Sequence, residues 1–373
     1  MRILFISAFV PSSKTAGQNY SNLLLQELSR KCIVDLVLFR NKKSYTFDIE
    51  SSNLHIKRYY TDTFISKLFN SLACIPFFPL FTARFSYIRA YYINKLLEQC
   101  HYDIVYLDFS QVFVYSLFFP RKVRSKILYM SHDVITQKYE RMGNPFILWW
   151  VNRTERFILR GVDNKQRKIY TFSMKDVEYM NNKLSLKANS TNFFINKIVA
   201  NALPVKVNDE YILFGAWKRP ENSVGLLWIL EFWKNRAIDT HERLVIIGGG
   251  LDKSVVDLVQ TMHNIVYEGW LLDPYVRIAN AKALIAPLFQ GAGVKVKVIE
   301  ALACGTPVIG TSVALEGIPA YMDNALYHFE SADDLSRILD KFDVDLKTKL
   351  RIKKDFISKY MGKNILKEFY SDY

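Results

Sequence analysis

The sequence is poor in residues that support disulfide or metal chemistry. Its four cysteines, Cys32, Cys74, Cys100 and Cys304, are scattered and form no C-x-x-C pair, and its six histidines show no H-E-x-x-H motif. The one D-x-D, at 343–345, suits the N-terminus of a helix, where carboxylates cap backbone N–H groups. We therefore expect buried free thiols in a reducing compartment, with disulfides as the alternative, and no metal site.

Long hydrophobic runs are also missing. No stretch reaches the roughly 20 unbroken apolar residues of a transmembrane helix. The nearest, 64–81 (FISKLFNSLACIPFFPLF), is interrupted by Lys67, Asn70 and two prolines. The apolar start MRILFISAFVP is too short for a signal peptide and is interpreted as a first buried strand. These features predict a cytoplasmic protein.

Acidic residues are outnumbered by basic ones. Lys and Arg total 50 against 36 Asp and Glu, which gives a net charge of +14 over 373 residues. A basic surface suits anionic substrates, nucleic acid or an anionic membrane. Nucleic acid is not expected, because the basic residues are spread along the chain and form no recognisable motif. Half of the residues are hydrophobic, and the length allows two domains with separate cores.

Alternating strand and helix patterns predict the fold class, α/β, and occur twice. The first half contains predicted strands at 2–9, 32–39, 102–109, 125–133 and 167–173, with helices at 17–31 and within 62–100. The second half repeats the architecture with strands at 210–217, 243–250, 264–270 and 283–289 and helices at 221–235, 254–262 and 273–281. We expect two doubly wound domains, joined near 201–210, that bind ligands at the carboxyl ends of their strands.

The stretch 287–311, PLFQGAGVKVKVIEALACGTPVIGT, permits two local structures. Alternation from Val294 to Val298 predicts a strand with its lysines on one face. The run Glu300–Cys304, followed by Gly305 and Thr306-Pro307, predicts instead a helix that starts near Gly293. On the second interpretation two lysines lie near the helix N-terminus, where the macrodipole disfavours cations unless an anion is bound.

The residue types of this stretch suit a phosphate. Gly291 and Gly293 permit close backbone approach, Lys295 and Lys297 supply charge, and Glu300 can accept from a ribose diol. The third glycine of a dinucleotide fingerprint is missing, and no G-K-[ST] of a Walker loop follows. The alternative is a solvated helix with a Lys297–Glu300 pair at i,i+3.

The stretch APLFQGAGVKVKVIEALACGTPVIGTSVALEGI closely resembles the donor-sugar signature of the group 1 glycosyltransferases, a retaining family with the GT-B fold. Further family segments are resembled by ILFGAWKRPENSVGLLWILEFW and LVIIGGG in the second half, and by PSSKTAGQNYSNLLLQELS, YMSHDV and NALP before them. The resemblance implies two Rossmann-like domains that face each other across a cleft. They would be an acceptor domain at 1–200 and a nucleotide-sugar domain at 201–350, with a helical tail at 351–373 that packs back on the N-terminal domain.

The resemblance also implies roles for residues of the second domain. Glu300 matches the second glutamate of the family's Glu-x7-Glu motif, whereas Ala292 replaces the first, which puts the identity of the sugar in doubt. The lysines take the diphosphate role. Lys218 or Arg219 substitutes for the family's basic pair, or belongs to an exposed turn. The donor-binding positions implied in full are Gly17, Gly215, Trp270, Leu271, Gly291, Ala292, Gly293, Val294, Lys295, Lys297 and Glu300.

Each of the remaining positions has a structural alternative. His132-Asp133 matches a position near the family's reaction centre, and the alternative is a strand-end pair that caps a helix. Gly17 and Gly215 would approach the donor phosphates; the alternative is that each belongs to an ordinary turn without a ligand. Trp270 would pack in the core instead of stacking on a base. The implied catalytic residues are His132, Asp133, Lys295 and Lys297.

The implied function is transfer of a sugar from a nucleotide-diphosphate sugar to a hydroxyl of a glycan or polyprenyl-linked acceptor, without metal or other cofactor, in surface polysaccharide biosynthesis. The rivals are a nucleotide-sugar epimerase of the same fold and a non-catalytic binding or scaffold protein, which Ala292 favours. The segment 62–92, with Lys67, Arg84 and Arg89, suits an interfacial helix on the anionic inner face of the membrane or, equally, a domain-packing region.

Overall fold

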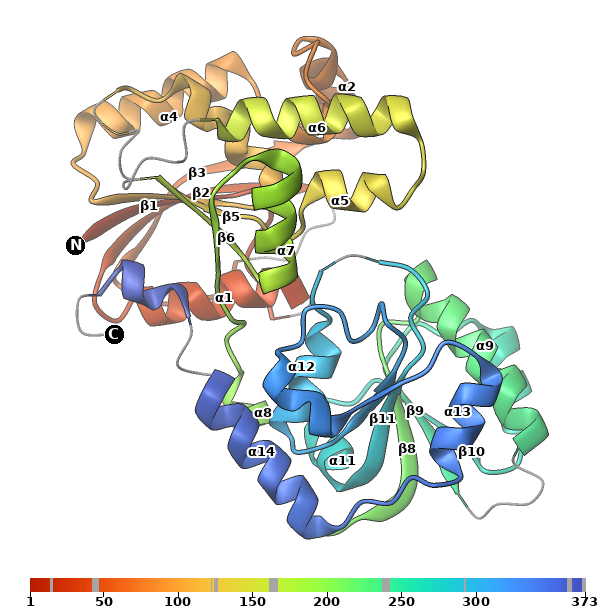
Figure 1. Cartoon of the computed structure of the whole chain (residues 1–373). Coiled ribbons are helices and arrows are strands. Elements are labelled where there is room, and N and C mark those ends of the chain that lie inside the picture. The colour runs from red at the N-terminus through yellow and green to blue at the C-terminus, as the bar shows by residue number, and fades with distance from the viewer. Residues whose placement is uncertain are drawn as a thin grey trace. The chain divides into compact units, whose positions relative to one another are not determined.

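The computed structural model describes residues 1–13, 16–41, 47–121, 123, 127–160, 167–236, 242–291, 293–360 and 364–370. The chain forms two compact units, one of Met1–Phe194 with Asn364–Tyr373 and one of Ile195–Lys363. Each unit is built on a parallel sheet flanked by helices (Figure 1). The expected α/β class, with two doubly wound sheets, is therefore confirmed.

The sheet of the first unit has seven strands in the order β3-β2-β1-β4-β5-β6-β7. Its central strands consist of apolar residues because helices cover both faces; Ile3, Leu4, Phe5 and Ile6 of β1 are fully buried. The strands are β1 (Arg2–Ser7), β2 (Ile33–Asn41), β3 (Leu54–Asp62), β4 (Ile104–Asp108), β5 (Ile127–Met130), β6 (Arg167–Thr171) and β7 (Ala188–Ser190).

Helices of the first unit lie on both faces of this sheet. Figure 1 shows α1 on one side and α2, α4 and α6 on the other. The region 62–100 is helical as predicted, in three separate pieces. The elements are α1 (Ala16–Leu28), α2 (Phe64–Leu72), α3 (Pro79–Thr82), α4 (Tyr87–Gln99), η1 (Ser110–Phe118), α5 (Ile135–Glu140), α6 (Pro145–Leu159), α7 (Met174–Tyr179) and η3 (Met180–Leu184).

The sheet of the second unit has the strand order β10-β9-β8-β11-β12-β13. Numbered within the unit this is 3-2-1-4-5-6, the order of a Rossmann fold, and its topological switch point lies between β8 and β11. The elements are α8 (Lys197–Asn201), β8 (Asn208–Phe214), α9 (Pro220–Arg236), β9 (Arg243–Ile247), α10 (Lys253–Gln260), β10 (Ile265–Gly269), α11 (Tyr275–Asn280), β11 (Ala281–Ala286), α12 (Val296–Ala303), β12 (Val308–Gly310), η4 (Ala320–Ala325), β13 (Leu326–His328), α13 (Ala332–Leu339) and α14 (Leu346–Tyr360).

The predicted tail 351–373 divides between the units. Helix α14 belongs to the second unit, where the Lys353 ammonium donates to the carbonyls of Ala200 (2.7 Å) and Ala303 (2.9 Å), at the C-terminal ends of α8 and α12. Cations stabilise such helix ends. The short helix η5 (Ile365–Glu368) belongs to the first unit, where the Glu368 carboxylate accepts from Lys168 (2.6 Å) and from the Tyr170 hydroxyl. The boundary between tail and second domain therefore lies near 363, and not at 350.

Candidate functional site

The stretch 287–311, for which the sequence allowed a strand or a helix around the two lysines, contains a helix there. Helix α12 begins at Val296 with Lys295 as its N-cap, so the strand prediction is wrong and the helix starts three residues after the predicted Gly293. Gly291 (φ 126°) and Gly293 (φ 70°) hold the preceding loop in left-handed backbone that side chains rarely adopt. Because the loop uses these glycines to turn, Lys295 and Lys297 lie at the start of the helix.

This loop leaves the carboxyl end of β11, beside β8, at the switch point of the second sheet. The first turn of α9, which follows β8, meets it through Asn222, whose amide oxygen accepts from the Lys297 ammonium (3.0 Å). A Cβ on Gly215 would lie 3.4 Å from that ammonium. The predicted Gly215, Gly291, Gly293, Lys295 and Lys297 therefore gather at the edge where such sheets bind ligands.

The two lysine ammonium groups repel each other, and a bound anion would stabilise their charged forms. Burial, together with the positive charge of Lys295, lowers the pKa of Lys297 to about 8. Arg219 acts in the same direction and Glu221 opposes it, so Arg219 is close enough to contribute to the positive field. The Lys295 ammonium folds back onto the Gly293 carbonyl (2.5 Å). Lys218 and Arg219 are exposed, as the turn alternative predicts.

Glu300 lies one turn further along α12 and does not pair with Lys297. Its carboxylate accepts from the Tyr275 hydroxyl (3.0 Å), and within the described part of the chain the i,i+3 ion pair with Lys297 is not formed. Burial raises the pKa of Glu300 to about 7, and the Tyr275 hydrogen bond opposes this shift. The alternative of a solvated helix with a charge pair is therefore wrong.

Trp270 follows the carboxyl end of β10 and is 71% exposed. The core-packing alternative for this side chain is wrong, because most of it is exposed; Gly269 (φ 70°) directly precedes it. A Cβ on Gly249 would lie 3.6 Å from the Trp270 Cβ, so the base of this side chain lies beside the glycine turn after β9. Leu271 is half-buried, as is Val294, and Ala292 lies outside the described residues.

His132 follows β5 in the first unit and pairs with an aspartate that the sequence did not single out. Its Nε2 lies 2.8 Å from the Asp108 Oδ1, and its ring stacks on Phe109 with centroids 3.7 Å apart. Its Nδ1 is buried without a hydrogen-bond partner among the described residues and lies 3.3 Å from where a Cβ of Gly17 would stand. The Asp133 side chain is exposed. Asp108 is thus the aspartate that holds His132, and the catalytic roles of His132 and Asp133 stay a prediction.

Asp108 ends the buried strand β4 and is fully buried. Its Oδ2 accepts from the hydroxyls of Ser7 and Ser21, both at 2.7 Å. Two hydroxyls from different elements thereby hold one carboxylate, which in turn orients the histidine. The available sequence signal was a single aspartate that closes an apolar strand, IVYLD.

Other polar residues noted in the sequence have structural roles. Glu155, which is fully buried, accepts from the Thr136 amide (2.9 Å) and hydroxyl (2.6 Å) and so caps α5. Asp345 accepts from the Thr348 amide (2.7 Å) and caps α14, as predicted for the D-x-D. Arg141 lies at the exposed C-terminal end of α5. Within the described ranges, no group of three or more His, Cys, Asp or Glu side chains gathers to hold a metal ion.

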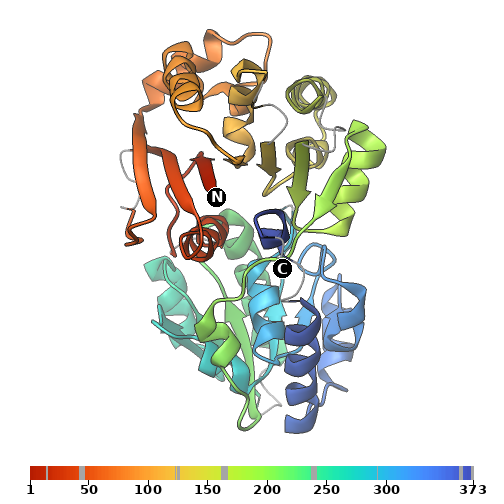
Figure 2. The ribbon, with the colours of Figure 1, turned by 90° about the vertical axis from the view of Figure 1, so that its left-hand side faces the viewer.

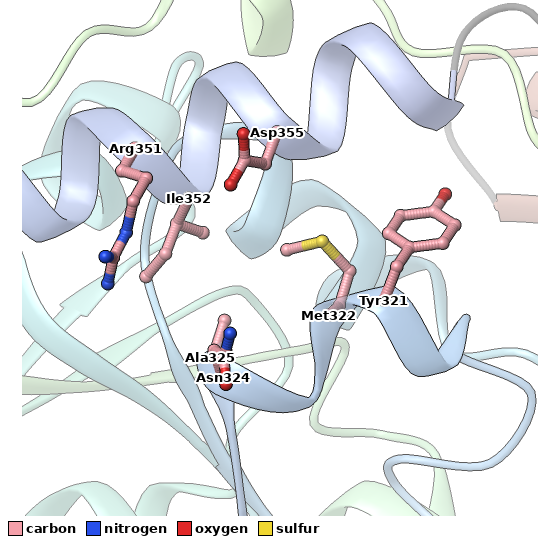
Figure 3. Close-up of a pocket in the computed structure, with 7 residues that line it drawn as sticks. All are labelled: Tyr321, Met322, Asn324, Ala325, Arg351, Ile352 and Asp355. Atoms are coloured by element: carbon pink, nitrogen blue, oxygen red, sulfur yellow. The ribbon is translucent and has the colours of Figure 1, made fainter.

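A small hollow between α14 and η4 is unrelated to this site. Its volume is about 30 Å³, far below the several hundred Å³ of a typical ligand pocket. Figure 3 shows Arg351, Ile352 and Asp355 of α14 on one side of it and Tyr321 and Met322 on the other. Because η4 precedes β13, the hollow adjoins the amino end of that strand and not the ligand-binding edge.

Comparisons with solved structures identify the fold. A sucrose-phosphate synthase from Thermosynechococcus elongatus is 15% identical, with a TM-score of 0.66 over 96% of this chain and 94% of that one. HepE from Anabaena, in complex with UDP, is 10% identical, with a TM-score of 0.62 over 99% and 97%. WaaG, a glycosyltransferase involved in lipopolysaccharide biosynthesis, is 14% identical, with a TM-score of 0.60 over 97% and 94%. The chain has the GT-B fold of these glycosyltransferases.

A family model matches much of the second unit. Residues 209–341 match the model of the glycosyl transferases group 1, the family that the sequence resembles. Family and fold together support a glycosyltransferase that uses a nucleotide sugar. No curated protein sequence matches the chain.

Proposed function

We propose that the chain transfers a sugar, with retention and without a metal ion, from a UDP-sugar to a hydroxyl of a glycan or polyprenyl-linked acceptor in surface polysaccharide biosynthesis. The observation that carries the proposal is the cluster of Lys295, Lys297 and Arg219 at the switch point, with Glu300 one turn away. UDP is the preferred nucleotide because HepE, of the same fold, binds it. WaaG, involved in lipopolysaccharide biosynthesis, supports the acceptor class.

In this proposal the second unit holds the donor. The diphosphate takes the place of the contacts that Lys295 and Lys297 now make with Gly293 and Asn222. Negative charge grows on the diphosphate as the bond to the sugar breaks, and prearranged ammonium groups and helix N–H groups stabilise that charge. Glu300 accepts from the ribose hydroxyls, and the exposed Trp270 is available to stack on the base.

The first unit contributes the acceptor-side residues. The Nδ1 of His132, which has no hydrogen-bond partner in the part of the chain that the structure describes, is the group available to a sugar hydroxyl, and Asp108 fixes the opposite ring nitrogen. Asp108 therefore positions His132, while Asp133 has no assigned contact. We assign no covalent nucleophile. A protein on the cytoplasmic side, with access to the inner face of the membrane, fits a polyprenyl-linked acceptor. Within the described residues no helix is long and apolar enough to span a bilayer.

Calorimetric titration with UDP, GDP and ADP, followed by hydrolysis of the matching nucleotide sugars, tests the donor site. We expect UDP to bind, and Lys297→Ala to weaken binding by about 10- to 100-fold, the value of a charge-assisted hydrogen bond. Lys253→Ala, at the start of α10, is the matched control and should bind normally. A double Lys295→Ala/Lys297→Ala variant that turns over normally would overturn the assignment. Binding without hydrolysis or transfer would favour the non-catalytic alternative.

A further inference from the structure

Helix α2 packs with its polar side toward the protein, whereas most surface helices turn their apolar side inward. The Lys67 ammonium donates to the Asn41 amide oxygen (2.6 Å) and the Asn70 amide to the Ala83 carbonyl (3.1 Å). A capping box between Thr63 and Ser66 closes its N-terminus, and none of its residues is buried. Its large apolar side chains therefore face outward: Phe64 (82% exposed), Ile65, Leu68, Phe69 and Leu72.

The apolar surface continues onto α6. The indole N–H of Trp150 donates to the Pro76 carbonyl (2.6 Å), which joins the end of α2 to α6. Phe146 stacks on Trp149 and contacts Trp150. Figure 1 shows α2 and α6 on the same side of the sheet, which Figure 2 shows from another direction. We name this surface the α2–α6 face; it consists of the exposed Phe64, Ile65, Leu68, Phe69, Leu72, Ile75, Phe146 and Trp149.

The exposed charges on the two segments that form this face have one sign. Residues 63–97 contain no Asp or Glu, and 141–160 contain only Glu155, which is buried beneath α5. Exposed cations lie over aromatic rings of α6, Arg153 over Trp149 (5.7 Å) and Arg160 over Phe157 (3.7 Å). The exposed Glu140 lies just before this second segment, at the end of α5. An aromatic and aliphatic face whose own segments carry only cations as exposed charges complements an anionic lipid surface.

The cations differ from those expected from the sequence. Arg84 and Arg89 both bind the buried Asp62, each at 2.7 Å, so they form part of the protein interior. Arg153 and Arg160 provide the rim instead, from a segment outside 62–92. The surface that combines exposed apolar side chains with exposed cations is therefore α2 with the start of α6, and not the whole of 62–92.

We propose that the α2–α6 face inserts into the headgroup region of an anionic lipid bilayer. Lipid is favoured over a second copy of the chain, because two such faces would bring basic rims together. Helix α2 follows the carboxyl end of β3, and the α5–α6 segment follows that of β5, beyond which His132 lies. The bilayer would thus adjoin the sheet edge that carries His132. This last step alone rests on the proposed function.

Vesicle flotation tests the proposal with the full chain and no donor present. We expect the protein to float with vesicles of phosphatidylcholine and phosphatidylglycerol (about 7:3) at low salt, and at least about 10-fold less with phosphatidylcholine alone. Leu68→Ser/Phe69→Ser/Leu72→Ser should lower flotation at least about 10-fold. The matched control, Leu258→Ser/Leu350→Ser, removes two exposed apolar side chains elsewhere and should float normally. Arg153→Gln/Arg160→Gln should lose binding to the anionic vesicles.

Three results would overturn the proposal: no flotation at low salt, undiminished flotation of the triple variant, or a dimer in sedimentation that the triple variant dissociates. UDP affinity measured on the same samples reports the donor site independently. The triple variant should keep that affinity and its melting temperature, because α2 contributes no buried side chain to the core. Failure of flotation with intact UDP binding therefore removes the membrane face and leaves the proposed function standing.

Discussion

Lys297 should make donor binding depend on pH. Its pKa in the free protein is lowered to about 8, first by burial and then by Lys295, whereas a bound diphosphate favours the ammonium form and raises the pKa. Below pH 8 the lysine is already charged, so affinity is constant. Above pH 8 binding must take up a proton, and the association constant for UDP should fall by up to about tenfold per pH unit.

Calorimetry with UDP from pH 7 to 9.5, at constant ionic strength, measures this dependence. Lys297→Met should bind more weakly and lose the decline between pH 8 and 9.5, while Lys253→Ala should reproduce the native profile. A native profile that stays flat to pH 9.5 would contradict the assignment of Lys297 to the diphosphate.

Asp108→Asn should change the tautomer of His132. The two serine hydroxyls, from Ser7 and Ser21, need an acceptor, so they fix the amide oxygen on their side and turn the amide N–H₂ toward the histidine. Nε2 then becomes an acceptor and the proton moves to Nδ1, the atom that we assign to a sugar hydroxyl. We expect kcat/KM for transfer to fall about 10- to 100-fold, with little change in UDP affinity.

Nitrogen chemical shifts of the His132 ring, measured by NMR, report the tautomer directly. An unchanged tautomer in Asp108→Asn, or a changed one with normal transfer, would show that Nδ1 does not contact the substrate.

Some residues of the candidate sites could be predicted from the sequence and others could not. Lys295, Lys297 and Glu300 were visible because they stand within one short, glycine-rich stretch. Asp108 of the first unit, and Asn222 and Tyr275 of the second, were missed, because each reaches its partner side chain from another element of its own unit. Their roles arise from strand order, which brings the carboxyl ends of separate strands to one edge, and strand order is not a local property of the sequence.

Helix α9 packs on the loop after β11 through a single glycine. A Cβ on Gly225 would lie 1.8 Å from the Pro287 carbonyl oxygen. This backbone atom cannot move without displacing the loop between β11 and α12. Gly225→Ala should therefore destabilise the second unit by about 2 kcal/mol or more, although alanine in an open helix position stabilises by about 1 kcal/mol. Val224→Ala, at a half-exposed neighbouring position, is the control.

Thermal unfolding measures the effect, with an expected drop of about 5 °C or more for Gly225→Ala. UDP affinity should fall with it, because the loop that carries Gly291 and Gly293 begins at this contact. A stabilised Gly225→Ala variant would show that α9 can withdraw from the loop at little cost.

Elements with a buried face were predicted, and elements without one were not. The strands β1, β4, β8, β9 and β11 were found because they are continuous apolar runs buried by helices. The edge strand β3 was missed, since LHIKRYYTD mixes charged and aromatic residues and is mostly exposed. The orientation of α2 could not be predicted either. Its periodicity is that of any amphipathic helix and does not specify which face turns inward.

The division of the whole chain into two units was visible as a repeated βα pattern, but its limits were not. The crossing of the C-terminal tail depends on contacts between residues that are far apart in sequence. Lys353 ties α14 to α8 and α12 in the second unit, whereas Glu368 ties η5 to β6 in the first. A hydrophobic pattern in a short helix does not specify which sheet it covers.

Removing residues 364–373 should destabilise the first unit and spare the donor site. Ile365, Leu366 and Phe369 are almost completely buried in that unit, and Phe369 packs on Tyr106. Loss of these three side chains should cost on the order of 5 kcal/mol of unfolding free energy, from the apolar area returned to water. Glu368→Gln, which keeps the apolar contacts and weakens the pairing with Lys168, should cost about 1 kcal/mol or less. Urea unfolding followed by hydrogen exchange locates the loss: protection should fall in peptides of β4 and β6, while the UDP-dependent protection of 287–300 persists. Equal loss of protection in both units would mean that the tail stabilises the chain as a whole, and normal stability of the truncated chain would mean that the first sheet does not depend on η5.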